Sequence, residues 1–209
     1  MLSGRRRYMG KRIERIPYQR VEYLENSELS EGLPYIDTEY MPNGDDIDIY
    51  VDFQYFKRLA NGGIVYSTYN SSLNRGFGLW LRDAFNSFQI RHNTPTNPYI
   101  SVGRYPIGGE KLRFSVIGKE YKAYVNGTET EIPINDGENA NNKNLIIFDN
   151  ESLRCVFKVY SFRLDKAGER VLDLVPVRID DVGYMYDRVS GRLFGNAGSG
   201  KFLLGPDIK

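Results

Sequence analysis

The sequence has little of what most enzyme sites and disulfide-stapled folds require. Its 209 residues include one cysteine, Cys155, and one histidine, His92. A single cysteine excludes an intramolecular disulfide, and this pair does not supply the ligands of a nitrogen–sulfur zinc site. Cys155 begins an apolar run, where we expect a buried, inert thiol. We expect His92, at a strand end, to be solvated or to donate a hydrogen bond, and not to form a dyad with Cys155.

Long apolar runs are also missing. No stretch approaches the roughly 18 apolar residues of a transmembrane helix, and the charged N-terminus lacks the apolar segment of a signal peptide. We therefore expect no membrane partner. No helical period of apolar residues is seen either, which argues against parallel βαβ units.

Alternation of apolar and polar residues is abundant instead. Residues 46–56 repeat with a period of two, which no helix satisfies. One face of this segment carries Ile47, Ile49, Val51, Phe53 and Tyr55. Further runs rich in Val, Ile, Tyr and Phe are typical of strands. They are residues 63–69, 77–82, 87–92, 112–117, 121–125, 145–148, 156–164, 171–177 and 184–187. Asn126-Gly127 separates two strand-like runs and predicts a type I′ hairpin turn. The sequence therefore predicts one all-β domain, a two-sheet antiparallel sandwich of the concanavalin-like jelly-roll type.

Charge is spread unevenly along the chain. The net charge is +1, yet residues 1–20 carry +6 and leave −5 for the remainder. We therefore divide the chain into an extended basic anchoring arm, residues 1–20, and a sandwich domain, residues 21–209, and expect the arm to dock on an acidic partner. The expected partner-binding residues are Arg5, Arg6, Arg7, Tyr8, Lys11, Arg12, Ile13, Arg15 and Ile16. Apolar residues among the cations favour a protein groove, so we expect no nucleic-acid partner.

The carboxylates do not form a hydrolase motif. Residues 46–52 alternate as in concanavalin-like glycoside hydrolases, but aspartates stand where two glutamates are needed, and aspartate is one methylene shorter. We expect a solvated strand face and no enzymatic activity. The oxygen-bearing loop residues lack a spaced calcium motif, so we expect no metal and no cofactor. These residues are Asn43, Asp45, Asp46, Asp136, Asp149 and Asp187.

One glycine-rich segment has the spacing of a phosphate-binding loop. Residues 195–201 read Gly-x-x-x-x-Gly-Lys, but Phe202 stands where a hydroxyl is required and no helix can follow. We expect a turn. Aromatic residues are plentiful, with 16 Tyr, 11 Phe and one Trp. We expect Trp80 in the core, with a sugar-stacking role as the alternative, and the excess of tyrosine suits protein interfaces.

Several segments resemble a known family. They are Val21-Glu-Tyr-Leu-Glu, Pro34-Tyr-Ile-Asp-Thr, Val159-Tyr-Ser-Phe-Arg, Asp173-Leu-Val-Pro-Val-Arg, residues 183–198 and Leu204-Gly-Pro-Asp. Together they resemble the laminin-G/concanavalin-like domain of virion structural proteins from tailed phages of gut Bacteroidales, crAss-like phages and prophages included. Within residues 183–198, we expect Asp187 to accept hydrogen bonds from the amides of a turn, which is a folding role.

The resemblance implies a jelly-roll fold and a virion location, and it supplies no catalytic or sugar-binding residue. We therefore expect a capsid-associated auxiliary, decoration or head-fibre protein that binds other virion proteins of the capsid, portal vertex or tail. The alternative is a carbohydrate-binding receptor-recognition module of a tail or fibre, with a cell-surface glycan as its ligand.

Overall fold

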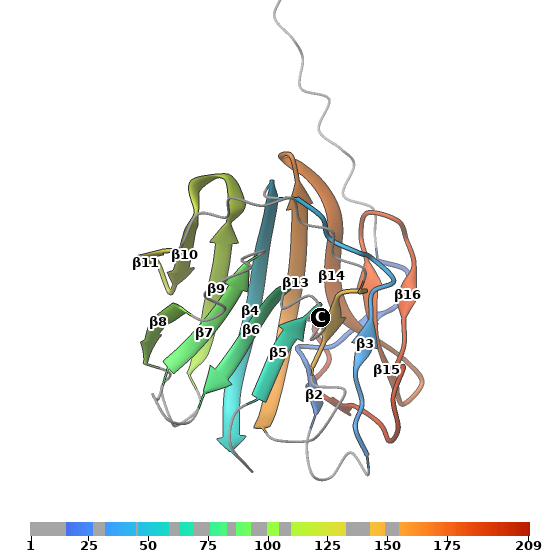
Figure 1. Cartoon of the computed structure of the whole chain (residues 1–209). Helices are drawn as coiled ribbons and strands as arrows, with labels where there is room; N and C mark the ends of the chain where they lie inside the picture. Colours follow the sequence, from blue (N-terminus) through green and yellow to red (C-terminus); the bar gives the residue numbers. More distant parts are fainter. Residues whose placement is uncertain are drawn as a thin grey trace, which may run out of the picture.

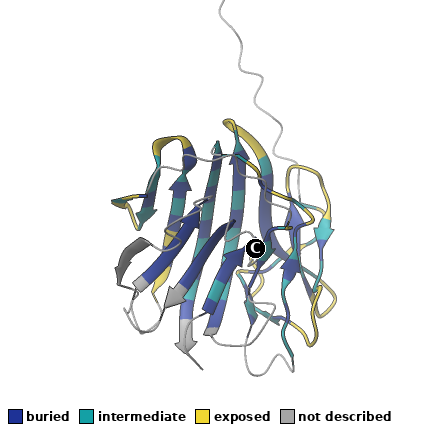
Figure 2. Ribbon diagram, viewed as in Figure 1, coloured by how far each residue is buried: buried dark blue, intermediate teal, exposed yellow. Residues whose placement is uncertain are grey.

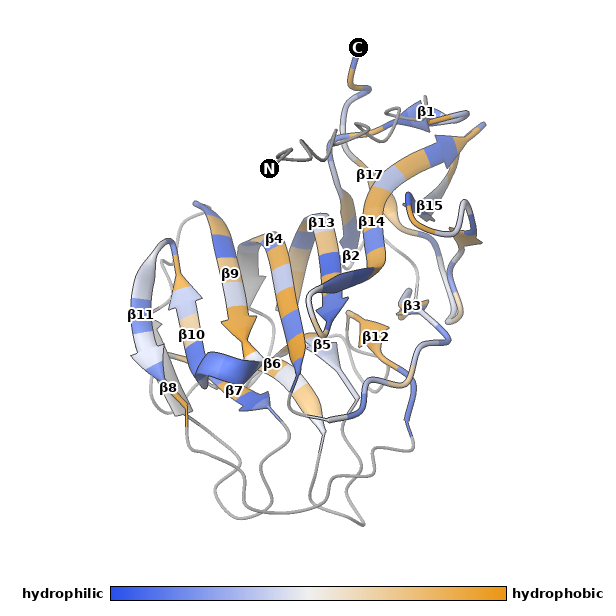
Figure 3. Cartoon of the chain, turned by 90° about the horizontal axis from the view of Figure 1, so that it is seen from above, coloured by the Kyte–Doolittle hydropathy of each residue, from blue (hydrophilic) through white to orange (hydrophobic). Residues whose placement is uncertain are grey.

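The chain folds into two antiparallel β-sheets that pack face to face (Figures 1 and 3). The computed structural model describes residues 16–26, 32–44, 46–58, 63–68, 76–82, 87–92, 100–104, 110–132, 143–148 and 155–209. Within these ranges the only helical element is the 3-10 turn Gly118–Glu120. No helix there is long and apolar enough to span a membrane. The prediction of an all-β concanavalin-like sandwich is confirmed.

The larger sheet has eleven strands, eight of them in the order β11-β10-β9-β4-β13-β14-β15-β16. Its strands are β1 (Gln19–Arg20), β2 (Leu24–Asn26), β4 (Ile47–Arg58), β9 (Lys111–Ile117), β10 (Lys122–Val125), β11 (Thr128–Glu131), β13 (Cys155–Lys166), β14 (Glu169–Ile179), β15 (Val182–Asp187), β16 (Leu193–Phe194) and β17 (Leu203–Leu204). The two longest, β4 and β13, lie side by side at its centre.

The smaller sheet has six strands in the order β3-β12-β5-β6-β7-β8. They are β3 (Ile36–Asp37), β5 (Gly63–Ser67), β6 (Phe77–Arg82), β7 (Ser87–His92), β8 (Ile100–Arg104) and β12 (Ile146–Ile147). In Figure 1 this sheet lies in front of the larger one.

The core lies between the two inner faces. Along β4 the alternation predicted from sequence appears as bands of buried and half-buried residues (Figure 2). Phe53 of β4 meets the ring of Phe88 from the opposite sheet with centroids 5.5 Å apart, and Tyr66 meets Phe162 at the same distance. Both pairs are edge-to-face, a favourable arrangement of aromatic rings. The sandwich is thus held by interleaved aromatic side chains.

The hairpin predicted at Asn126-Gly127 is confirmed. The two residues join β10 to β11 with φ of 49° and 85°, the positive values of a type I′ turn. The Asn126 side chain also accepts a hydrogen bond from the Arg113 backbone amide at 2.8 Å. This bond fastens the turn to the neighbouring strand β9.

Candidate attachment site

The described chain begins with a segment packed on the outer face of the larger sheet. Ile16 and Tyr18 cover Val175, Val177 and Tyr186, and the rings of Tyr18 and Tyr186 are 5.6 Å apart. The sandwich therefore includes residues from at least Ile16, whereas we expected it to begin at residue 21.

Two outcomes follow for the predicted partner-binding residues. The Ile16 side chain is half-buried and packs against its own domain on the β14–β15 surface, and its contact with a partner stays a prediction. The remaining predicted residues lie outside the described residues: Arg5, Arg6, Arg7, Tyr8, Lys11, Arg12, Ile13 and Arg15.

The segment that follows is held from two sides. On one side β1 pairs with β14, with Gln19 opposite Arg178. On the other side the Ile208 amide donates to the Arg20 carbonyl, and the Glu22 amide donates to the Pro206 carbonyl, both at 2.9 Å. Both ends of the described chain are thus clamped together through residues 19–22 and 206–208.

An ion pair reinforces this clamp. The Arg178 guanidinium donates to both carboxylate oxygens of Asp207, at 2.8 and 2.9 Å. This contact lowers the pKa of Asp207 and raises that of Arg178. A two-point guanidinium–carboxylate contact fixes orientation as well as charge.

The outer face of the larger sheet carries a row of tyrosines and lysines. Lys111 Nζ lies 4.3 Å from the ring of Tyr160, and Lys158 Nζ lies 4.2 Å from the ring of Tyr23. The two rings touch edge to face at 5.6 Å, and the Tyr160 hydroxyl donates to Gln54 Oε1 at 2.6 Å. Burial, with the Glu22 charge, raises the pKa of Tyr160 to about 12. The row is amphipathic: Tyr23, Tyr160 and Lys158 are half-buried, and Lys111 is exposed.

The acidic strand face of β4 makes structural contacts. Asp48 accepts a hydrogen bond from the Gly118 amide at 3.0 Å, and partial burial raises its pKa. Asp52 pairs with Arg113 at 3.3 Å and Lys111 at 3.6 Å. Both carboxylates therefore stabilise the junction of β4 with β9 and the turn after it.

No group of three or more His, Cys, Asp or Glu side chains that could hold a metal is found within the described ranges. Of the weak calcium candidates, Asp45, Asp136 and Asp149 lie outside them.

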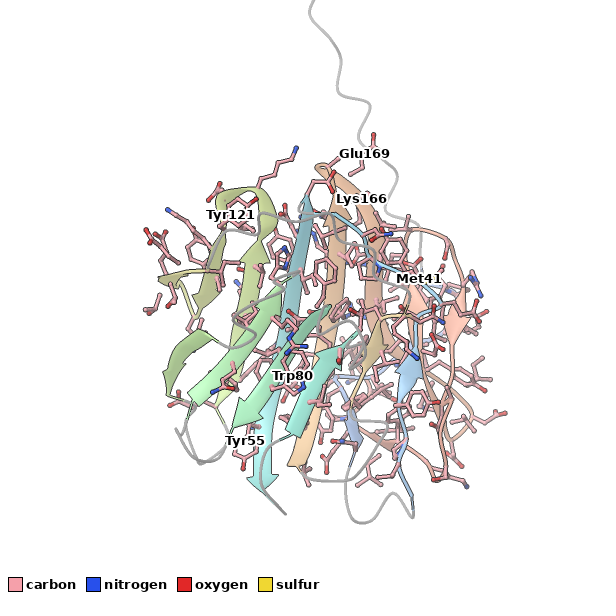
Figure 4. All side chains as sticks on the ribbon, viewed as in Figure 1. Met41, Tyr55, Trp80, Tyr121, Lys166 and Glu169 are labelled. Atoms are coloured by element: carbon pink, nitrogen blue, oxygen red, sulfur yellow. The ribbon has the colours of Figure 1, made fainter. Side chains whose placement is uncertain are left out.

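Trp80, a residue of β6, lies on the outer face of the smaller sheet (Figure 4). Its ring covers Gly78 so closely that a Cβ there would fall 2.1 Å from a ring carbon. The Arg91 guanidinium is 5.7 Å from the centroid of the Trp80 ring, and Gln89 is the cross-strand neighbour of Trp80. Trp80 is only 8% exposed and Arg91 1%. So covered, the indole offers little area for a sugar to stack on.

His92 differs from the expectation of a solvated side chain. It is 4% exposed and meets Phe77 edge to face at 4.9 Å. Within the described residues neither ring nitrogen has a hydrogen-bond partner, and burial lowers its pKa to about 3. The reason is register: Phe88, Ile90 and His92 alternate on the core side of β7. The Cys155 side chain lies outside the described residues, although its backbone belongs to β13.

The predicted turn at Asp187 is confirmed, and the Asp187 carboxylate also bonds to a neighbouring strand. Its carboxylate accepts bonds from the amides of Val189 and Ser190, both at 3.1 Å. It also accepts from the amide of Asp173 at 2.9 Å, across the sheet on β14. The glycine-rich segment 195–201 forms a turn as expected, with Asn196 Oδ1 accepting from the Gly198 amide at 2.8 Å.

Sequence reasoning missed the tyrosine–lysine row and the polar neighbours of Trp80. The row is built from Tyr23, which directly precedes β2, Lys111 on β9, and Lys158 and Tyr160 on β13, and only sheet pairing brings these residues together. The polar neighbours of Trp80 could have been predicted from the alternation in residues 87–92, because it places Gln89 and Arg91 on one face of the strand.

Comparison with known proteins identifies no particular family for this chain. No family model matches the chain, and no curated protein does. Among solved structures it is similar to the heptameric SAP-like pentraxin from Limulus polyphemus. The TM-score is 0.48 at 13% sequence identity, over 75% of this chain and 79% of the pentraxin chain. A likeness at this level says nothing about what this chain binds.

Proposed function

We propose that this chain is a non-enzymatic virion structural protein, a capsid-associated auxiliary or head-fibre component attached through its basic N-terminal segment. The observation that carries the proposal is the clamp at residues 16–22, which fixes the root of that segment to the sandwich. Residues 1–15 carry +5. The sequence resemblance to virion proteins of tailed phages supplies the location.

The physical logic is that of a tether. A cationic segment binds an acidic protein surface by charge, and exposed contacts are screened beyond roughly 8 Å at physiological ionic strength. Attachment should therefore weaken as salt rises, apart from the share supplied by Tyr8, Met9 and Ile13. A rigid root then transmits the position of the partner to the whole sandwich.

Deletion of residues 1–15 tests the proposal. The truncated chain keeps Ile16, Tyr18 and β1, so its thermal midpoint should match that of the full chain. It should be lost from purified phage particles in which labelled full-length chain is seen by electron microscopy. A second variant, with the six basic residues of 1–15 changed to glutamine, separates charge from length. Normal incorporation of both variants would contradict the proposal.

A second candidate function is glycan recognition by the tyrosine–lysine row. The observation in its favour is two adjacent tyrosine rings on one outer face, bordered by amide and carboxylate acceptors. Aromatic faces and planar polar groups are what sugar rings contact. Tyr23→Ala with Tyr160→Ala should abolish any binding on a glycan array, while Tyr124→Ala, on strand β10 away from the row, should leave it unchanged. Binding that survives the double change would reject the row as the site.

A further inference from the structure

Lysine ammonium groups lie over the ring faces of the tyrosine–lysine row, which consists of Tyr23, Tyr160, Lys111 and Lys158. Lys111 Nζ is 4.3 Å from the centroid of the Tyr160 ring, and Lys158 Nζ is 4.2 Å from that of the Tyr23 ring. A ring face attracts the cation above it, and a covered face is no longer open to a neutral sugar ring. A ligand that approaches these two faces therefore meets positive charge first.

A carboxylate lies beneath the cations at one end of the row. The side chains of Lys111 and Arg113 are 51% and 80% exposed, whereas that of Asp52, which both contact, is 20% exposed. The strand register explains this layering, because Asp52 of β4 lies directly opposite Arg113 of β9. Among the described residues the two cations share this one carboxylate, so one positive charge is left over at the exposed level.

Arg113 keeps donors for an incoming anion. It contacts Asp52 through Nε alone, at 3.3 Å, so its two terminal nitrogens have no acceptor within the described residues. The nitrogens of a guanidinium form a planar fork that matches the two oxygens of a carboxylate. Arg113 can therefore bind a ligand carboxylate at two points while it keeps its bond to Asp52.

We propose that the tyrosine–lysine row selects sugars that bear a carboxylate, as uronic acids do, with Lys111 and Arg113 as the residues that bind the carboxylate. The adjacent Tyr23 and Tyr160 contact the sugar ring that carries it. This inference rests on the second candidate function, glycan recognition by the row, and names the class of glycan.

The tyrosines favour a sugar acid over an acidic peptide. A peptide rich in aspartate or glutamate needs only the two cations. A sugar also offers hydroxyl groups to the Tyr160 phenol and the Gln54 amide, which a 2.6 Å hydrogen bond already holds together. Tyrosine presents an apolar body and a polar tip, which suits a ring that has both C–H and O–H groups.

Uronic-acid oligomers and their methyl esters test the proposal. The full chain is titrated calorimetrically with oligomers of polygalacturonate and alginate, and with the methyl ester of each, which keeps the sugar and removes the charge. At low ionic strength we expect the acids to bind about tenfold more tightly than the esters, the effect of one charge-assisted contact. The difference should shrink as salt is added, because Lys111 and Arg113 are exposed.

Matched variants assign the preference to the two cations. Lys111→Gln with Arg113→Gln should remove it. Lys122→Gln should keep it, because Lys122 pairs with Ile117 at the other end of β9, roughly 20 Å from Lys111 along the strand. Asp52→Asn removes the competing carboxylate, so it should strengthen binding of the acids and leave that of the esters unchanged. Thermal midpoints should stay close to that of the unmodified chain, since these side chains lie outside the core.

The inference and the candidate function fail separately. Equal binding of acids and esters, abolished by Tyr23→Ala with Tyr160→Ala, would overturn the selection for charge and leave glycan recognition standing. A preference that survives the double glutamine change would also overturn the inference. Poly-L-glutamate that binds as tightly as the uronic acids would do the same and identify an acidic protein as the partner. If neither acids nor esters bind, both the inference and glycan recognition by the row are rejected, and the virion proposal is unaffected.

Discussion

The two sheets differ in how many of their buried polar groups have hydrogen-bond partners among the described residues. In the larger sheet Asn26 accepts from the Phe157 amide at 2.8 Å, and Asp187 accepts from three backbone amides. In the smaller sheet the hydroxyl of Tyr66, Oε1 of Gln89 and both nitrogens of His92 are buried without a hydrogen-bond partner within the described residues. One such atom, Arg20 Nε, belongs to the larger sheet.

The difference teaches which polar groups hold the fold. Burying a polar group without a hydrogen-bond partner costs free energy. Hydrogen-bonded buried groups therefore stabilise the fold, whereas unbonded ones destabilise it. The larger sheet uses its buried polar groups to fix turns and register. Unbonded groups in a native structure call for an explanation of their own, and they single out β5 and β7 for mutation.

The largest expected effect is at Asp187. Asp187→Ala would leave the amides of Asp173, Val189 and Ser190 without their acceptor, and should lower the free energy of unfolding by about 4 kcal/mol. Urea titration measures it. Asp187→Asn, which keeps one acceptor oxygen, should lose less. Equal losses for the two variants would show that the turn depends on charge and not on hydrogen bonds.

The next effect is a pH dependence due to His92. Its pKa is about 3 in the folded chain and about 6.5 when unfolded, so the unfolded state binds the extra proton between these values. Stability is complete above pH 6.5 and falls toward pH 3, by up to ~1.4 kcal/mol per pH unit. His92→Phe should flatten this part of the stability–pH curve. An unchanged slope would assign the acid sensitivity to carboxylates.

A smaller effect is expected at Gly78. Gly78→Ala places a methyl group within the volume of the Trp80 ring, and displacing the ring should cost about 1–3 kcal/mol. In a Trp80→Leu background the same change should cost less, because the ring is gone. A double-mutant cycle with no coupling between the two sites would show that the ring moves away freely.

The smallest expected effects come from removing the hydroxyl of Tyr66 or that of Tyr160. Tyr66→Phe removes a buried hydroxyl without a partner, so it should be neutral or stabilise by up to ~1 kcal/mol. Tyr160→Phe removes the bond to Gln54 and should destabilise by about 1 kcal/mol. Thermal unfolding of both variants side by side is the measurement. A loss of stability for both would remove the contrast between the sheets.

Sequence alone predicted the long strands and, of the two-residue strands, only β12, which lies within the predicted run 145–148. The eleven-residue alternation of 46–56 became β4, and 171–177 lies within β14, because a period of two needs several residues to be seen. Strands β1, β3 and β17 have two residues each and are defined by their partners. The Asp187 turn could be predicted because its bonds to residues 189 and 190 are local. The bond to Asp173 could not, since it depends on sheet pairing.

The clamp at the chain ends has a mechanical consequence. Residues 19–22 are bonded to β14 on one side and to residues 206–208 on the other. A pull along this segment loads both rows of hydrogen bonds in shear, so that several must break together and not one after another. The C-terminal residues therefore help to hold residues 19–22 in place. Removal of residues 206–209 should lower the force needed to pull residues 19–22 out of the sandwich.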